Sequence, residues 1–308
     1  LVQRGYQEAI TYSFVEPTLQ QQVEPDLRAV RLANPISTEM SVMRTRLWPG
    51  LIRTAQHNLN RQQSRLRVFE IGLTYARQSN DISQDQYIGG LVFGSRYPEQ
   101  WGVASVAADF FDVKADVEAL LDSGGRGDFV FRSDRHPALH PARSARILRS
   151  EQPVGWLGTV HPELAKSLEL PEDTILFEIA GLAIEQGRLP RFREISRHPA
   201  IRRDLAFVVP REVSADAVRS LVVSTAGELL QELTLFDVYA GKAIESGRKS
   251  LALGLILQDS SRTLTDQDVE GVLVQVQTAL GANFGATLRE ETLWRLPKLI
   301  LLRIYSVL

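Results

Sequence analysis

The sequence predicts an α+β fold built from two parts. Up to residue 187, segments that alternate apolar and polar residues predict a mostly antiparallel sheet with helices between its strands. Residues 197–290 predict strands and helices in the order β-α-β-β-α-β, which is the ferredoxin-like pattern. We therefore expect domains at 1–187 and 197–290, an arginine- and proline-rich linker at 188–196, and an apolar tail of uncertain origin at 291–308.

The first expected strand is 6–15, because Tyr6, Ile10, Tyr12 and Phe14 would share one face of it. Proline residues then predict a loop up to a helix over 48–59 that starts with a proline, which suits a first turn. A second helix, 109–122, has an aspartate at the N-cap position. The other elements expected in this part are strands at 67–76, 87–94 and 174–181, a hairpin over 145–160 and a short helix at 161–168.

The second part starts with a strand at 204–210, after which Ser214 is placed to cap a helix. Two strands, 229–241 and 249–258, would form a hairpin around residues 242–248. The spacing of Thr265 and Asp268 resembles a capping box and predicts the start of a second helix. Residues 283–289 would form the last strand.

Composition excludes several classes of site. The chain has no cysteine, so disulfides, zinc–cysteine sites, cysteine-ligated iron–sulfur clusters and a catalytic thiol are impossible. It has neither a run of 18 apolar residues nor a signal sequence, so we expect a cytoplasmic protein that does not enter a membrane. Because it starts at Leu1, we expect a fragment of something longer. The formal net charge of −2 argues, taken globally, against a nucleic-acid binder.

Local charge is less even than the total. Residues 41–68 hold six arginines and no acidic residue, and 126–149 and 188–203 are also rich in arginine. Such clusters suit phosphate backbones or an acidic partner subunit, although solvated arginines and local ion pairs would explain them equally well. From the first cluster we assign Arg44, Arg46 and Arg53 to a subunit interface or to a nucleic-acid backbone.

The second part is mildly acidic overall, so any RNA contact there must be a local patch. Phe207, Phe236 and Tyr239 are available for base stacking, with a place in the core as the alternative for each. The candidate RNA-binding residues are Arg202, Arg203, Lys242, Arg248, Lys249 and Arg262.

No catalytic or metal-binding residue is predicted. His136 and His140 lie four residues apart, but the prolines beside them favour a loop and no third ligand is evident. Neither a phosphate-binding GxxxxGK[ST] loop nor a GxSxG motif is present.

Long motifs resemble one family, the bacterial phenylalanine–tRNA ligase β subunit, in its carboxy-terminal part. GYQEAITYSF, LANPISTEMSVMRTRLWPGLI, RVFEIG, DFFDVKADVEALL and GWLGTVHPEL are similar to its class II synthetase-like core, in that order. SRHPAIRRDLAFVV and LFDVYAGKAIESGRKSLALGLILQ resemble its ferredoxin-fold anticodon-binding domain. Ala142 stands where that family usually has glycine.

The resemblance implies an α2β2 tetramer that charges tRNA(Phe) with phenylalanine, using ATP and Mg²⁺. The α subunit would carry catalysis, the first part of this chain would be a degenerate class II core packed on α, and the second part would hold the anticodon arm. We therefore expect the chain alone to be inactive and to bind neither ATP nor Mg²⁺. The sequence supports this independently, because the strand after RVFEIG lacks the glycine-rich pattern that ends in a purine-clamping arginine.

Two alternatives belong to other classes. One is a self-sufficient class II adenylating enzyme, which ATP–pyrophosphate exchange by the isolated chain would reveal. The other is a regulatory protein whose ferredoxin-like domain senses a small ligand.

Overall fold

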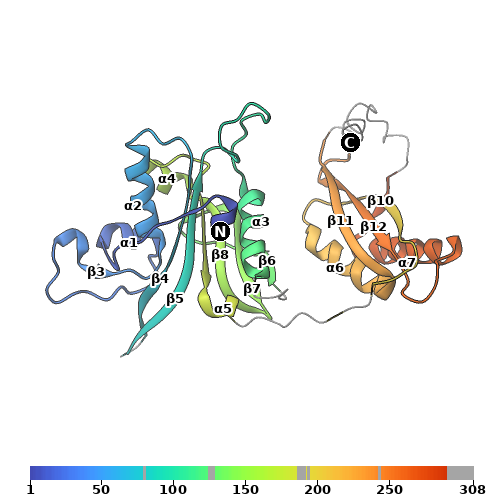
Figure 1. The fold of residues 1–308 in the computed structure, drawn as a ribbon, viewed down its shortest axis with the longest axis horizontal. Coiled ribbons are helices and arrows are strands. Elements are labelled where there is room, and N and C mark those ends of the chain that lie inside the picture. The colour runs from blue at the N-terminus through green and yellow to red at the C-terminus, as the bar shows by residue number, and fades with distance from the viewer. Residues whose placement is uncertain (79–80, 124–128, 186–191, 193–194, 242–243, 290–308) are drawn as a thin grey trace. The chain divides into compact units, whose positions relative to one another are not determined.

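The computed structural model describes residues 1–78, 81–123, 129–185, 192, 195–241 and 244–289. Contacts divide the chain into two compact units, Leu1–Arg191 (unit 1) and Phe192–Leu308 (unit 2) (Figure 1). The expected tail at 291–308 and residue Lys242 lie outside the described residues. Within the described part, no helix is both long enough and apolar enough to cross a bilayer.

Unit 1 is built on a seven-stranded sheet in the order β1-β4-β5-β9-β8-β7-β6. All neighbours are antiparallel except β1 and β4, which run parallel. The strands are β1 (Gln7–Glu8), β4 (Leu66–Gln78), β5 (Asp81–Phe93), β6 (Phe129–Ser133), β7 (Leu139–Arg149), β8 (Gln152–Val160) and β9 (Ile175–Ala180). A separate ribbon pairs β2 (Phe14–Val15) with β3 (Val42–Met43).

Helices cover both faces of this sheet (Figure 1). On one face, α2 and α4 pack with Val68 and Leu91 in one apolar cluster, which also takes in α1. On the other face, α3 and α5 pack with Phe69 and Phe177 in a second cluster. The alternation of Val68 and Phe69 between the two faces follows from the two-residue period of a strand. The helices are α1 (Pro17–Val23), α2 (Trp48–Leu59), α3 (Phe110–Asp122), α4 (Pro162–Ser167) and α5 (Gly181–Glu185), with 3-10 turns η1 (Val2–Arg4) and η2 (Thr38–Met40).

Unit 2 has two layers, a four-stranded antiparallel sheet and two helices (Figure 1). The strands are β10 (Ile201–Pro210), β11 (Leu230–Tyr239), β12 (Arg248–Leu257) and β13 (Thr287–Leu288), in the spatial order β11-β12-β10-β13. The helices are α6 (Ala215–Ala226) and α7 (Asp266–Phe284), and a 3-10 turn, η3 (Gly227–Leu229), precedes β11. The chain order β-α-β-β-α-β and this strand order confirm the ferredoxin-like prediction.

Local signals placed the helix starts correctly. Asp109 accepts hydrogen bonds from the backbone N–H groups of Phe111 and Asp112, and Ser214 accepts one from Ala217. Thr265 and Asp268 form the reciprocal capping box that their spacing predicted. These caps satisfy N–H groups that have no partner inside the helix.

Two predictions near the start of the chain are wrong. Residues 6–15 do not form one strand, since only Gln7–Glu8 and Phe14–Val15 pair, and Ile10 is 91% exposed. The polar Thr11 turns inward instead, where its hydroxyl donates to Glu70 at 2.7 Å. The loop expected next contains helix α1, because Pro17 occupies a first-turn position that needs no N–H donor. Strand β6 and helix α5 were not predicted.

Candidate nucleic-acid interface

The helices α6 and α7 cover one face of the four-stranded sheet of unit 2, and we call the opposite face the open face. Leu205, Phe207 and Val209 of β10 point into the core with both helices, so the prediction that Phe207 is available for base stacking is wrong. The residues that alternate with these three in β10 belong to the other face, and so do the residues of β12 that pair with those alternating residues. Small residues form the centre of that open face: Ala206, Ser250, Ala252 and Gly254. All four are themselves buried, so the accessible surface of this face comes from the longer side chains around them.

Two arginine–aromatic pairs flank this centre. The Cζ atom of Arg202 lies 5.7 Å from the ring centroid of Phe236, and that of Arg289 lies 5.4 Å from the ring centroid of Tyr239. Phe236 is 40% exposed and Tyr239 38% exposed, so neither ring is a core residue. Exposed aromatic rings beside guanidinium groups offer stacking surfaces and phosphate donors together, which is the combination that single-stranded RNA needs.

Gly254 makes room for one of these pairs. A Cβ atom built on Gly254 would lie 3.0 Å from Nη2 of Arg202 and 3.1 Å from Oδ1 of Asp204. Arg202 Nε donates to Oδ1 of Asp204 at 2.9 Å, which fixes the side chain across the face. The glycine thus permits the close approach of Arg202 to the sheet.

Arg289 was not among the predicted residues. Its backbone N–H donates to the carbonyl of Ala206 at 2.9 Å, and its Nη1 donates to Ser250 Oγ at 3.3 Å. It follows the short last strand, so sequence periodicity gave no signal for its face; only pairing with β10 brings it over the sheet.

The other predicted residues of unit 2 have different surroundings. Arg203 is 3.8 Å from Asp266 of α7. Arg248 Nη2 donates to the carbonyls of Val208 and Gly285 at 3.1 and 2.8 Å, which ties the hairpin to the end of α7. The structure therefore does not gather the predicted residues on the open face.

Neighbouring groups shift the pKa of Lys249 and that of Arg262. Partial burial, and then the charge of Arg211, lower the pKa of Lys249. Arg262 makes two hydrogen bonds to Asp268, at 2.7 and 2.9 Å, and these raise the pKa of Arg262. Arg262 is thereby held at the N-terminus of α7 rather than on the sheet.

The arginines assigned to an interface in unit 1 are mostly internal. Arg44, 3% exposed, pairs with Glu70 at 2.7 Å. Arg46 pairs with Glu178 at 2.7 Å and also with Glu24. These two side chains therefore belong to the interior of unit 1, and we do not assign them to an accessible basic surface. Arg53 is exposed and pairs with Glu16.

His136 also belongs to the interior. Its Nε2 lies 3.2 Å from Glu24 Oε2, and its ring meets Trp48 and Trp156 edge-on at centroid distances of 5.0 Å. His140 Nδ1 accepts from the backbone N–H of Ala142 at 3.1 Å. Among the residues that the structure describes, no group of three or more His, Asp or Glu side chains could hold a metal ion.

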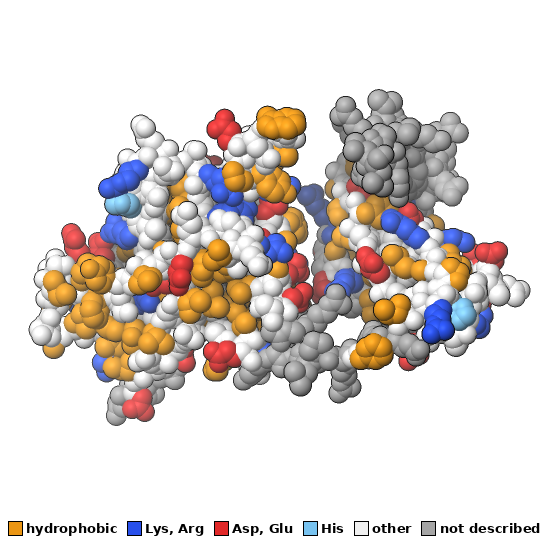
Figure 2. All heavy atoms as spheres, viewed as in Figure 1, with side chains coloured by type: hydrophobic (Ala, Val, Ile, Leu, Met, Phe, Trp, Pro, Cys, Tyr) orange, Lys and Arg blue, Asp and Glu red, His pale blue; other side chains and the backbone are white. Residues whose placement is uncertain are grey.

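Charge on the surface is mixed. On the face shown in Figure 2, basic, acidic and apolar side chains are interspersed over both units. A binding surface on this face would therefore be defined by a few positioned side chains rather than by a broad basic field.

Unit 2 is a ferredoxin-like domain whose open face pairs arginines with partly exposed aromatic rings, and comparison with known proteins gives a family match for each unit. Residues 1–180 match the family model described as "Phenylalanyl tRNA synthetase beta chain CLM domain", and residues 196–289 match "Ferredoxin-fold anticodon binding domain". The first match alone covers more than half of the chain, and the chain belongs to this phenylalanyl-tRNA synthetase β chain family.

Curated relatives agree. The phenylalanine–tRNA ligase β subunit of Pseudomonas syringae pv. tomato is 50% identical over 291 residues, which is 94% of this chain and 37% of that protein. The corresponding subunit of Pseudomonas putida is 51% identical over the same shares. The chain therefore spans 37% of the length of the curated relatives it matches.

One solved structure, a pyrrolysyl tRNA synthetase from Desulfitobacterium hafniense, shares 14% identity at a TM-score of 0.44, over 59% of this chain and 61% of that one. This likeness is too weak to support an argument about fold.

Proposed function

We propose that the chain acts as part of a phenylalanine–tRNA ligase β subunit in the ATP-dependent charging of tRNA(Phe) with phenylalanine. Unit 1 would be a class II synthetase-like, non-catalytic core that packs against the catalytic α subunit, and unit 2 would bind the anticodon arm. The observation that carries this proposal is the match to both family models, in order, over chain segments that coincide with compact sheets. The alternatives of a ligand sensor and a self-sufficient adenylating enzyme have no comparable support.

The partners and cofactors follow from the same proposal. The complex would contain two α and two β subunits, work in the cytoplasm and use ATP and Mg²⁺. Glu70, a carboxylate, lies in the middle of β4, and the nearby Arg44 is engaged by it in an ion pair. The middle of this strand therefore has no free arginine that could serve in adenylate formation. Catalytic residues are accordingly assigned to the α subunit.

Within unit 2, we assign tRNA contacts to the open face and not to Arg262, whose guanidinium is engaged by Asp268. Arg202 and Arg289 would neutralise phosphates, and Phe236 and Tyr239 would stack on bases. Arg248 is kept as a candidate for the rim of the same surface. Arg203 and Lys249, which share the register of the helix-covered face, stay candidates outside it. Lys242, outside the described residues, and Arg53 of unit 1 also stay candidates.

The test uses the complete α2β2 complex with substitutions in β. Phe236→Ala removes a stacking surface that contributes about 1–3 kcal/mol per base, so tRNA(Phe) binding should weaken by about tenfold. Its dependence on salt should stay the same, because no charge is lost. Arg202→Gln should also weaken binding, and should reduce the slope of log K against log salt by about one.

Arg219→Gln is the matched control, since Arg219 is an exposed arginine on α6, away from the open face. Affinity and salt slope should be those of the unaltered complex. If Phe236→Ala and Arg202→Gln leave tRNA affinity and the KM for tRNA unchanged, the open face is not the tRNA-binding surface.

A further inference from the structure

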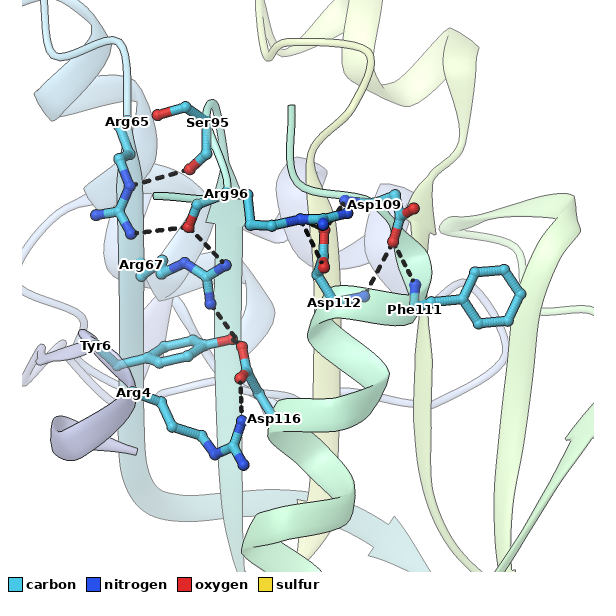
Figure 3. A network of polar contacts seen from close by, with 10 residues as sticks. All are labelled: Arg4, Tyr6, Arg65, Arg67, Ser95, Arg96, Asp109, Phe111, Asp112 and Asp116. Carbon is cyan, nitrogen blue, oxygen red and sulfur yellow. Dashed lines mark hydrogen bonds and ion pairs between the residues drawn. The ribbon is translucent and has the colours of Figure 1, made fainter. Parts of the chain in front are cut away.

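A cleft in unit 1 carries more positive charge than its own carboxylates neutralise. Its volume is about 580 Å³ and four arginines and two aspartates line it: Arg4, Arg65, Arg67, Arg96, Asp112 and Asp116. The arginines come from three segments, which are η1, residues 65–67 at the start of β4 and the turn after β5. Figure 3 shows Arg4, Arg67 and Arg96 reaching toward α3, with Arg65 beside the backbone of Ser95 and Arg96. The formal balance of these side chains is two positive charges.

Asp116 makes the polar contacts that connect the residues at the base of the cleft. It pairs with Arg4 at 3.0 Å and with Arg67 at 2.6 Å, and it accepts a hydrogen bond from the Tyr6 hydroxyl at 2.9 Å (Figure 3). Burial, and then the charge of Asp116, raise the pKa of Tyr6, so its hydroxyl stays protonated and donates. The side chain of Arg67 is only 6% exposed, and its Nε is buried without a hydrogen-bond partner. The single carboxylate of Asp116 is therefore the ion-pair partner of two guanidinium groups, those of Arg4 and Arg67.

At the rim of the cleft, arginines also outnumber carboxylates. Arg96 Nε is 2.9 Å from Asp112, and the Arg96 side chain is 38% exposed. Arg65 donates only to backbone carbonyls, those of Ser95 at 3.0 Å and Arg96 at 3.4 Å, and has no carboxylate partner among the described residues. Partial burial, and then the charge of Arg67, lower the pKa of Arg65. Another anion beside Arg65 would relieve this repulsion.

We propose that this cleft binds a phosphoryl group, with Arg65 and Arg96 as its principal donors and Arg4 at its edge. Guanidinium groups match the geometry of phosphate oxygens through paired N–H donors. The site is distinct from the open face of unit 2, and the proposal does not depend on tRNA binding there. The phosphoryl group would come either from a free phosphate compound or from the backbone of an RNA strand.

Calorimetric titration of the 308-residue chain with inorganic pyrophosphate tests the proposal. We expect saturable binding that weakens by about tenfold in Arg65→Gln and in Arg96→Gln. Arg61→Gln is the control, because Arg61 is exposed and hydrogen-bonds to His57. Absence of saturable binding, or equal weakening in all three variants, would overturn the assignment.

Asp112→Asn supplies a test of opposite sign. Asparagine keeps an acceptor for the backbone N–H of Asp109 but removes the charge that holds Arg96. Pyrophosphate should then bind several-fold more tightly, which a purely structural role of the cluster does not predict. Circular dichroism checks that each variant is folded; should Asp112→Asn not fold, Arg65→Gln alone decides, since its side chain is half-buried at the rim.

Competition identifies the source of the phosphoryl group. A short single-stranded oligoribonucleotide is added to the Phe236→Ala chain, in which the open face of unit 2 is impaired. If it displaces pyrophosphate, the cleft takes backbone phosphates; if pyrophosphate binding is unaffected, the ligand is a free phosphate compound.

Discussion

Arg44 and Glu70 show how the meaning of a residue depends on its distant neighbours. In the sequence, Arg44 belongs to a run of arginines without one acidic residue, which suggested an exposed basic surface. In the folded protein its Nε donates to the carbonyl of Leu73 and its Nη1 to Glu70, at 2.8 and 2.7 Å. Glu24, Glu178 and Asp116 neutralise further arginines of the same run from other elements. Counting charge along the chain could not detect this, because the compensating carboxylates are remote in sequence.

Breaking the Arg44–Glu70 pair should be costly. Both side chains are 3% exposed, so Arg44→Met leaves a buried, uncompensated carboxylate and should lower the free energy of unfolding by about 3–5 kcal/mol. Arg44→Met combined with Glu70→Met removes both charges and should cost much less. Urea unfolding of unit 1 measures both, and a double variant as unstable as the single one would contradict this account.

At the scale of elements, the starts of the capped helices were predicted better than the short strands. Helix starts depend on residues close in sequence, as at Asp109 and Thr265, so local reasoning located them within one residue. Short strands depend on a partner elsewhere: β2 exists because it pairs with β3, and β13 because it pairs with β10. The last strand was accordingly expected to begin inside what is the end of α7.

The cap of α7 predicts a pH dependence. Hydrogen bonds from Arg262, and then from Thr265, lower the pKa of Asp268 below its ordinary value of 3.8. A lowered carboxyl pKa stabilises the folded state above pH 3.8, and this contribution is lost as the pH falls further. Asp268→Asn should therefore destabilise unit 2 at neutral pH and show a smaller loss on acidification than the unaltered protein.

Thermal unfolding of both proteins at pH values from neutral to strongly acidic measures this difference. Thr265→Ala is the companion variant: it removes the hydroxyl cap and should cost about 1 kcal/mol without abolishing the acid-dependent loss. Parallel pH profiles for Asp268→Asn and the unaltered protein would show that Asp268 does not carry the dependence.

At the scale of the whole molecule, each unit has its own core. The cluster formed by β10, β12, α6 and α7 contains residues of unit 2 alone, and both other clusters contain residues of unit 1 alone. The ends of the two family matches, at residues 180 and 196, fall on either side of the division between the units.

Unit 2 should therefore fold without unit 1. A fragment of residues 196–289 is expected to unfold in one cooperative thermal transition, because its sheet and both helices share one apolar cluster. Circular dichroism measures the transition. A fragment that melts gradually, while the complete chain melts cooperatively, would mean that unit 2 depends on unit 1 for its stability.

The sequence by itself determined the α+β class, the ferredoxin-like order of unit 2, the main helix caps and the family resemblance, because each is written in local periodicity or in contiguous motifs. Only the tertiary structure decided which arginines are buried, which lie on the open sheet face with Phe236 and Tyr239, and which remain under-neutralised in the cleft beside Asp116. Electrostatic balance and exposure are properties of neighbours in space, and strand pairing brings those neighbours together from segments far apart in the chain.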